Sequence, residues 1–132
     1  MGDTKKTGGL AGITAGTTEL CTVGKEGAGL TYRGYDIYDL AANASFMEVA
    51  YLLLKGKLPT ATELDAYIAR VKGMRGLPDA LKTVLEMVPA DAHPMDVLRT
   101  GVSFLGNVEP EGDFANQQDV ADRLLASLPS MM

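Results

Sequence analysis

The sequence predicts a mainly α-helical protein that begins with a short β-hairpin. Three observations support this fold class: two short N-terminal segments alternate in polarity, helical periodicity runs from Asp36 onward, and Ser/Thr-x-x-Glu capping boxes recur. The 132 residues match the usual length of one domain and suffice to bury a hydrophobic core. We expect one multi-helical domain over residues 10–132, with a disordered tail over residues 1–9.

The hairpin is expected over about residues 19–33. Its strands would be Glu19–Val23 and Leu30–Arg33, and the glycine-rich segment 24–29 between them suits a chain reversal. The pair Gly24-Lys25 does not indicate a phosphate-binding loop, because that motif needs Ser or Thr after the lysine and Glu26 follows here.

About six helices follow the hairpin. Asp36 can cap a first helix that runs through Asn43. Ser45 and Glu48 form a capping box at the start of the second helix, which ends at Gly56. Apolar residues surround this second helix on nearly every side, so we expect it to be buried on most sides.

The third helix is expected from about Ala61 to Met74, because Thr60 and Glu63 repeat the capping box. Gly76 closes this segment. One apolar stripe should face the core, formed by Leu64, Tyr67, Ile68, Val71 and Met74.

Prolines and glycines delimit the remaining helices. Pro78 fits the first turn of a fourth helix, which Pro89 stops, and a fifth helix starts around Pro94. Gly101 inside the fifth helix costs up to about 1 kcal/mol relative to Ala, so it should permit a close contact with another helix.

A loop from Gly106 to Ala115 should separate the fifth helix from a last one that begins near Asn116. That helix runs into Pro129, and Met131-Met132 follow directly after its apolar stripe. Native C-termini usually finish with a cap or a polar tail, so we expect a truncated chain, with a frayed helix end as the alternative.

Composition excludes several classes of protein. The formal net charge of -5 and the absence of a Lys/Arg cluster disfavour a nucleic-acid partner. No apolar run approaches the roughly 20 residues of a membrane span, and the first residues lack a signal-peptide core, so we expect a cytoplasmic protein. The single Cys21 cannot form an internal disulfide and is better explained as a half-buried hydrophobe than as a nucleophile.

The sequence offers few candidate functional residues. One histidine and one cysteine far apart make no zinc site, and the acidic loop Glu109–Asp113 lacks the EF-hand ligand pattern. His93 precedes Pro94 at a helix start, where a cap or a packing contact is favoured over catalysis. Arg33 could bind an anionic ligand or pair with Asp36 or Asp39. We therefore predict no catalytic, substrate-binding or metal-binding residue in this chain.

Four segments together resemble the citrate synthase family, in the same order and with similar spacing. They are Gly9–Ile13, the run Tyr32-Arg33-Gly34-Tyr35-Asp36-Ile37 leading to Asp39-Leu40-Ala41, the run Glu48–Leu54 with Gly56–Thr60, and His93-Pro94-Met95. Within the family, the segments most similar to the 2-methylcitrate synthase branch are Leu20–Lys25, His93–Ser103 and Asp119–Leu128.

The resemblance implies the N-terminal portion of the helical large domain of a homodimeric enzyme. Such an enzyme condenses oxaloacetate with an acyl-CoA, which is propionyl-CoA in the 2-methylcitrate branch and acetyl-CoA in citrate synthase itself, and it needs no cofactor. The family's catalytic aspartate and histidines lie in segments that this chain does not contain. The chain alone should therefore be inactive. A non-catalytic helical interaction module remains as an alternative of a different class.

Overall fold

The computed structural model describes residues 16–24 and 29–132. The predicted tail over residues 1–9 and the middle of the hairpin connection lie outside the described residues. The elements in chain order are β1 (Cys21–Val23), β2 (Leu30–Tyr32), β3 (Tyr35–Asp36), α1 (Ile37–Asn43), α2 (Phe46–Lys55), α3 (Ala61–Gly73), α4 (Asp79–Glu86), α5 (Pro94–Val108), the 3₁₀ helix η1 (Phe114–Asn116), α6 (Gln117–Ser127) and the 3₁₀ helix η2 (Leu128–Met131). The predicted mainly helical fold is confirmed.

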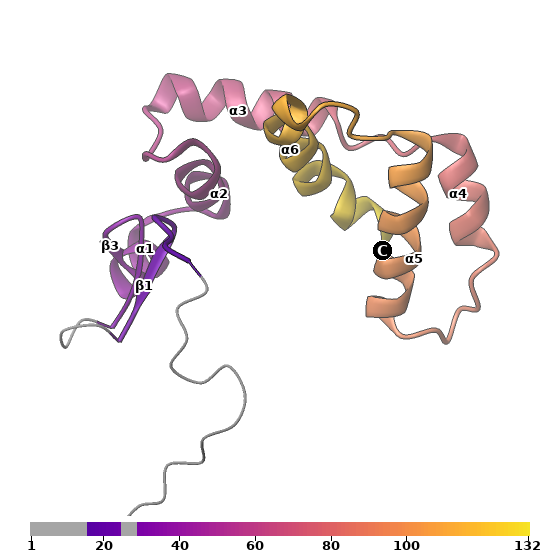
Figure 1. Ribbon diagram of the computed structural model, residues 1–132, viewed down its shortest axis with the longest axis horizontal. Helices are drawn as coiled ribbons and strands as arrows, with labels where there is room; N and C mark the ends of the chain where they lie inside the picture. Colours follow the sequence, from indigo (N-terminus) through magenta and orange to yellow (C-terminus); the bar gives the residue numbers. More distant parts are fainter. Residues whose placement is uncertain (1–15, 25–28) are drawn as a thin grey trace, which may run out of the picture.

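The elements form an elongated arrangement. Figure 1 shows the sheet and α1 at one end, α4 and α5 at the opposite end, and α3 and α6 along the middle. α6 packs against α3 on one side and continues into η2, which contacts α5. No helix in the described part of the chain has both the length and the apolar character that a membrane span requires.

The predicted hairpin is confirmed, and a third strand extends it. β1 pairs antiparallel with β2, with Cys21 opposite Tyr32, and β2 pairs antiparallel with β3, with Tyr32 opposite Tyr35. The third strand was not predicted, because a strand of two residues carries no measurable alternation.

The helix starts follow the predicted capping chemistry. The Asp36 carboxylate accepts the Tyr38 amide at 2.8 Å, which caps α1. Ser45 with Glu48 and Thr60 with Glu63 form complete capping boxes at the starts of α2 and α3. α4 begins at Asp79, so Pro78 precedes the helix instead of lying in its first turn.

The expectation that α2 is buried on most sides is wrong for the described residues. Ala50 and Leu52 are buried, whereas Phe46 remains 72% exposed. α3 covers one side of α2, and another side lines an apolar hollow of about 420 Å³ that residues of α6 also line. Among the described residues, α2 is therefore fully covered on one side only, and its apolar side chains at the hollow are partly exposed.

The loop predicted from Gly106 to Ala115 is shorter in the structure. α5 continues to Val108 and the Glu109 amide still donates to the Leu105 carbonyl at 2.8 Å. The backbone bonds of the last turn outweigh the low helix propensity of Gly106. η1 then occupies the far end of the predicted loop.

Two small hydrophobic cores hold the helices. The first contains the buried residues Tyr67, Val71 and Ala126, and the second contains Leu81, Leu105 and Met131. The predicted close contact at Gly101 is confirmed, because a Cβ there would lie 2.9 Å from the Met131 sulfur.

Candidate functional site

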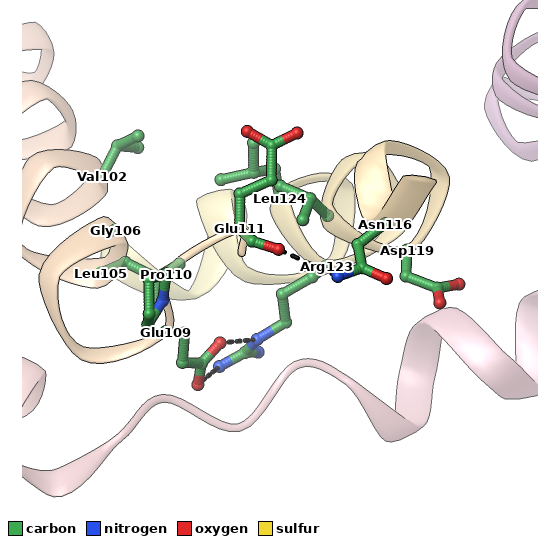
Figure 2. A pocket seen from close by; sticks show the side chains of 11 residues that line it. Val102, Leu105, Gly106, Glu109, Pro110, Glu111, Asn116, Asp119, Arg123 and Leu124 are labelled. Carbon is green, nitrogen blue, oxygen red and sulfur yellow. Dashed lines mark hydrogen bonds and ion pairs between the residues drawn. The ribbon is translucent and has the colours of Figure 1, made fainter. Parts of the chain in front are cut away.

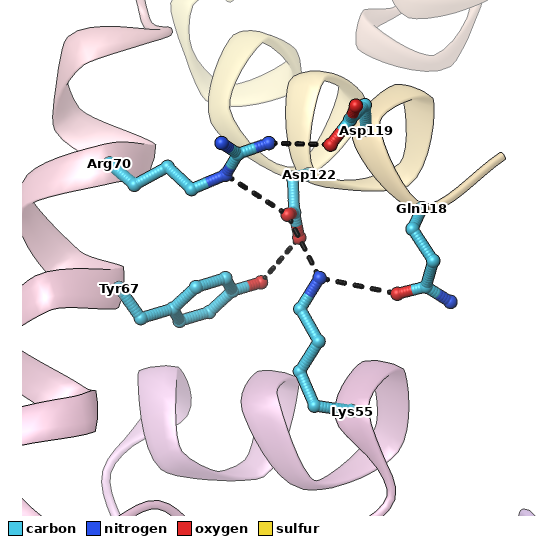
Figure 3. A network of polar contacts seen from close by, with 6 residues as sticks. All are labelled: Lys55, Tyr67, Arg70, Gln118, Asp119 and Asp122. Carbon is cyan, nitrogen blue, oxygen red and sulfur yellow. Dashed lines mark hydrogen bonds and ion pairs between the residues drawn. The ribbon is translucent and has the colours of Figure 1, made fainter. Parts of the chain in front are cut away.

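A buried carboxylate joins three helices. Asp122 of α6 is 1% exposed. Its Oδ1 accepts the Tyr67 hydroxyl at 2.9 Å, and its Oδ2 accepts Lys55 Nζ at 3.0 Å and Arg70 Nε at 3.3 Å (Figure 3). Both carboxylate oxygens are therefore occupied by donors from α2 and α3.

Helical spacing explains how these side chains meet. Tyr67 and Arg70 are three residues apart on α3, so they share one face. On α6, Gln118 accepts Lys55 Nζ at 3.2 Å and Asp119 accepts Arg70 Nη2 at 2.7 Å. Lys55 lies in the last turn of α2, where a cation also complements the helix dipole.

The surroundings of Asp122 favour a structural role over acid-base chemistry. Burial of the Tyr67 ring and its hydrogen bond to Asp122 both raise the pKa of the Tyr67 hydroxyl, which therefore stays protonated as a donor. The Tyr51 ring contacts the Tyr67 ring edge-on at a centroid distance of 5.2 Å, and Lys55 Nζ lies 5.8 Å from the same centroid. Asp122 is also only 1% exposed, which keeps its carboxylate out of reach of a substrate.

A second polar feature borders a hollow of about 460 Å³ between α5 and α6 (Figure 2). Arg123 Nε and Nη2 donate to the two carboxylate oxygens of Glu109 at 2.8 and 2.9 Å. Arg123 Nη1 also donates to the carbonyls of Met74 and Gly76. The Arg123 hydrogen bond lowers the pKa of the Glu109 carboxyl, so this pair is charged near neutral pH.

The hollow has an apolar floor and a charged rim. Its apolar side chains include Val102, Leu105, Val120 and Leu124. Arg123 is committed to Glu109 and to two carbonyls, and the described residues that line the hollow include no Ser, Thr, Cys, Lys, Tyr or His. In residues 16–24 and 29–132, no group of three or more His, Cys, Asp or Glu side chains could hold a metal ion.

Of the two structural roles that the sequence left open for His93, a cap or a packing contact, the structure shows the cap. Its Nδ1 accepts the Met95 amide at 3.2 Å, at the N-cap of α5. Cys21 is half-buried in β1, in agreement with its interpretation as a small hydrophobe.

Arg33 does not pair with either predicted carboxylate. Its guanidinium contacts Glu19 at 3.5 Å and the Leu53 carbonyl at 3.1 Å. Asp36 instead caps α1.

Sequence reasoning missed Asp122 and the Arg123–Glu109 pair. The sequence around an aspartate that borders the apolar face of a helix looks the same whether that aspartate is buried or exposed. Glu109 was expected in an acidic loop, whereas it is the C-cap residue of α5 and pairs with Arg123. The only usable signal was the i, i+3 spacing of Tyr67 and Arg70, which places a hydroxyl and a cation on one helix face.

The fold and the polar contacts of Asp122 and Arg123 define a helical scaffold domain. Its described residues form no complete catalytic site. The chain belongs to the citrate synthase family, since the family model described as the C-terminal domain of citrate synthase matches residues 9–132. The predicted family resemblance is confirmed. The placement of residues 10–132 at the N-terminal end of such an enzyme remains a prediction.

Relatives support the same family and also its 2-methylcitrate branch. The chain is 63% identical over 134 residues to the 2-methylcitrate synthase of Shewanella oneidensis, covering 100% of this chain and 36% of that protein. It is 42% identical to the 2-methylcitrate synthase of Mycobacterium tuberculosis, covering 98% of this chain and 33% of that protein. The chain thus spans about a third of the length of these relatives.

A solved structure shares the fold. The citrate synthase of Pyrobaculum aerophilum matches with a TM-score of 0.81 and 31% sequence identity, over 92% of this chain and 33% of that chain. The helical arrangement described above is therefore a part of the citrate synthase fold.

Proposed function

We propose that this chain is the N-terminal part of a 2-methylcitrate synthase. The whole enzyme would condense propionyl-CoA with oxaloacetate and water to give 2-methylcitrate and free CoA. The observation that carries this proposal is the 63% identity to the Shewanella oneidensis 2-methylcitrate synthase across the full 132 residues.

In this reaction a base removes a proton from the carbon beside the thioester, and hydrogen-bond donors stabilise the enolate oxygen. The enolate carbon then attacks the ketone of oxaloacetate, and hydrolysis of the thioester releases CoA. We assign these catalytic groups to segments outside residues 1–132, because His93 is the only histidine in the chain and caps α5. We also propose that the reaction uses no metal or prosthetic group.

The role of this chain in the proposed enzyme is to hold the helical framework. Asp122 joins α2, α3 and α6, and Arg123 joins α6 to Glu109 and to the chain that follows α3. Asp122 is 1% exposed and Arg123 is paired with Glu109, so we assign neither group to catalysis. The isolated chain should therefore release no CoA from either acyl-CoA.

The test compares two polypeptides and two substrates. The intact mass of the protein from its native source establishes whether the polypeptide is several-fold larger than 14.0 kDa. That protein should release CoA from propionyl-CoA and oxaloacetate, whereas the 132-residue chain should not. A native mass near 14.0 kDa, or CoA release by the short chain, would contradict the proposal.

A second candidate is a citrate synthase that uses acetyl-CoA. The Pyrobaculum aerophilum citrate synthase favours it, with 31% identity over most of this chain. The ratio of kcat/KM for propionyl-CoA and acetyl-CoA separates the two candidates, and our proposal requires the propionyl-CoA value to be larger.

We further propose that the enzyme is cytoplasmic and acts as a homodimer. Sedimentation of the native protein would test the dimer. A native mass near 14.0 kDa together with a well-folded monomer would instead favour the non-catalytic interaction module, for which the apolar hollow between α2 and α6 would be the contact surface.

A further inference from the structure

The described N-terminal elements form a unit that is weakly joined to the helices. This N-terminal sheet unit comprises β1, β2, β3 and α1, and Leu40 is its buried residue. Within residues 16–24 and 29–132, one hydrogen bond links the unit to the helices from α2 onward, from Arg33 Nη2 to the Leu53 carbonyl at 3.1 Å. Arg33 therefore supplies the one hydrogen bond that joins the unit to the helical body among the described residues.

The backbone of Arg33 adopts an unfavourable conformation. Arg33 and Gly34 form the two-residue turn between β2 and β3, with φ angles of +50° and +87°. Positive φ at both central positions is the requirement of a type I′ turn, for which Asn, Asp and Gly are the preferred residues. Among the described residues, Arg33 is the one non-glycine with a positive φ. An arginine here costs free energy that a residue such as asparagine would not.

The side chain explains why arginine occupies this turn. Leu53 lies in the last turn of α2, where carbonyls lack donors within the helix and carry the negative end of the helix dipole. The Arg33 guanidinium supplies both a donor and a positive charge there. Its other partner, Glu19, is 3.5 Å away and 94% exposed, so that ion pair contributes little.

We propose that Arg33 acts as a latch that closes the N-terminal sheet unit onto the C-terminal turn of α2. The strained turn aims the guanidinium at the Leu53 carbonyl, and this bond offsets the strain. When the bond opens, the sheet unit separates from α2 while α3 to α6 stay folded. The unit is thus a locally opening segment with its own free energy of opening.

Amide hydrogen exchange on the full chain tests the latch with two variants. Arg33→Asn removes the guanidinium but suits a positive φ, and Arg33→Lys retains the charge with a single donor group. The latch predicts that exchange in β2, β3 and α1 accelerates by about tenfold or more in Arg33→Asn and by less in Arg33→Lys. If the arginine served only the turn, the order would reverse, because asparagine relieves the strain and lysine does not.

Two controls separate the latch from other effects. Glu19→Gln removes the exposed partner of Arg33, and Arg99→Gln removes another exposed guanidinium that pairs with Asp96 at 3.0 Å. Both should leave exchange in the sheet unit within about twofold of the parent chain. Exchange within twofold in Arg33→Asn as well, or equal acceleration in α3 and α6, would overturn the proposal.

Discussion

Replacing the buried carboxylate by an amide tests whether the Asp122 network holds the scaffold together. Asp122→Asn keeps the side-chain volume but removes the charge that accepts bonds from Lys55, Tyr67 and Arg70. One half of the new amide is itself a donor, so it faces at least one donor of the network without an acceptor. The loss should therefore exceed that of a single neutral hydrogen bond.

The size of this loss of stability follows from the burial of Asp122. Removing one partner of a buried ion pair costs about 3–5 kcal/mol. Here the cations can regain water, because the side chains of Lys55 and Arg70 are 27% and 48% exposed. The free energy of unfolding should consequently fall by about 3 kcal/mol, toward the low end of that range.

Urea unfolding followed by circular dichroism measures this change. With an m-value of about 1.5 kcal/mol/M, the midpoint should fall by about 2 M while the m-value stays the same. The matched control is Asp119→Asn, because Asp119 also pairs with Arg70 but is 77% exposed, and it should cost less than about 0.5 kcal/mol. Equal shifts for the two variants would refute the argument that burial gives Asp122 its importance.

Three further predictions concern packing, acid stability and the α5 cap. Gly101→Val should lower the free energy of unfolding by about 2 kcal/mol, because the valine side chain would overlap Met131. Urea unfolding measures this loss, which should be smaller in a Met131→Ala background. The hydrogen bond from Lys57 lowers the pKa of the Glu63 carboxyl to about 2. The ionised carboxylate therefore stabilises the fold at pH values above the usual pKa of glutamate, and this contribution is lost as the pH falls toward 2. NMR titration of Glu63 should show this value, and a midpoint near 4.5 would contradict it. His93→Ala should cost about 1 kcal/mol through loss of the α5 cap, His93→Asn should restore most of it, and failure of that rescue in thermal unfolding would count against a capping role.

The sequence was most informative where structure depends on near neighbours. The caps at Ser45 and Thr60 were predictable, because each needs only a hydroxyl and a glutamate three residues later. The place of His93 before Pro94 narrowed its role to a cap or a packing contact, and the structure shows the cap. Such contacts are set by spacing along the chain, which a sequence records directly.

Contacts between segments far apart in the sequence were harder to predict. The burial of Asp122 depends on Tyr67, which is 55 positions away, and no local pattern around either residue reveals the other. The partner of Arg33 is a backbone carbonyl, which every residue possesses and which therefore leaves no trace in side-chain identity. The apolar circumference of α2 predicted burial, but periodicity does not say which neighbour provides the cover.

The position of α6 explains why the scaffold depends on this one helix. Its Ala126 belongs to the core with Tyr67 and Val71, whereas η2, which continues from it, places Met131 in the core with Leu81 and Leu105. The polar ties follow the same division, because Asp122 binds α2 and α3 while Arg123 binds Glu109 at the end of α5. Neighbouring residues of α6 therefore connect opposite ends of an elongated molecule. A destabilising substitution in α6 should weaken both hydrophobic cores, whereas one in α4 should weaken only the core that contains Leu81, Leu105 and Met131.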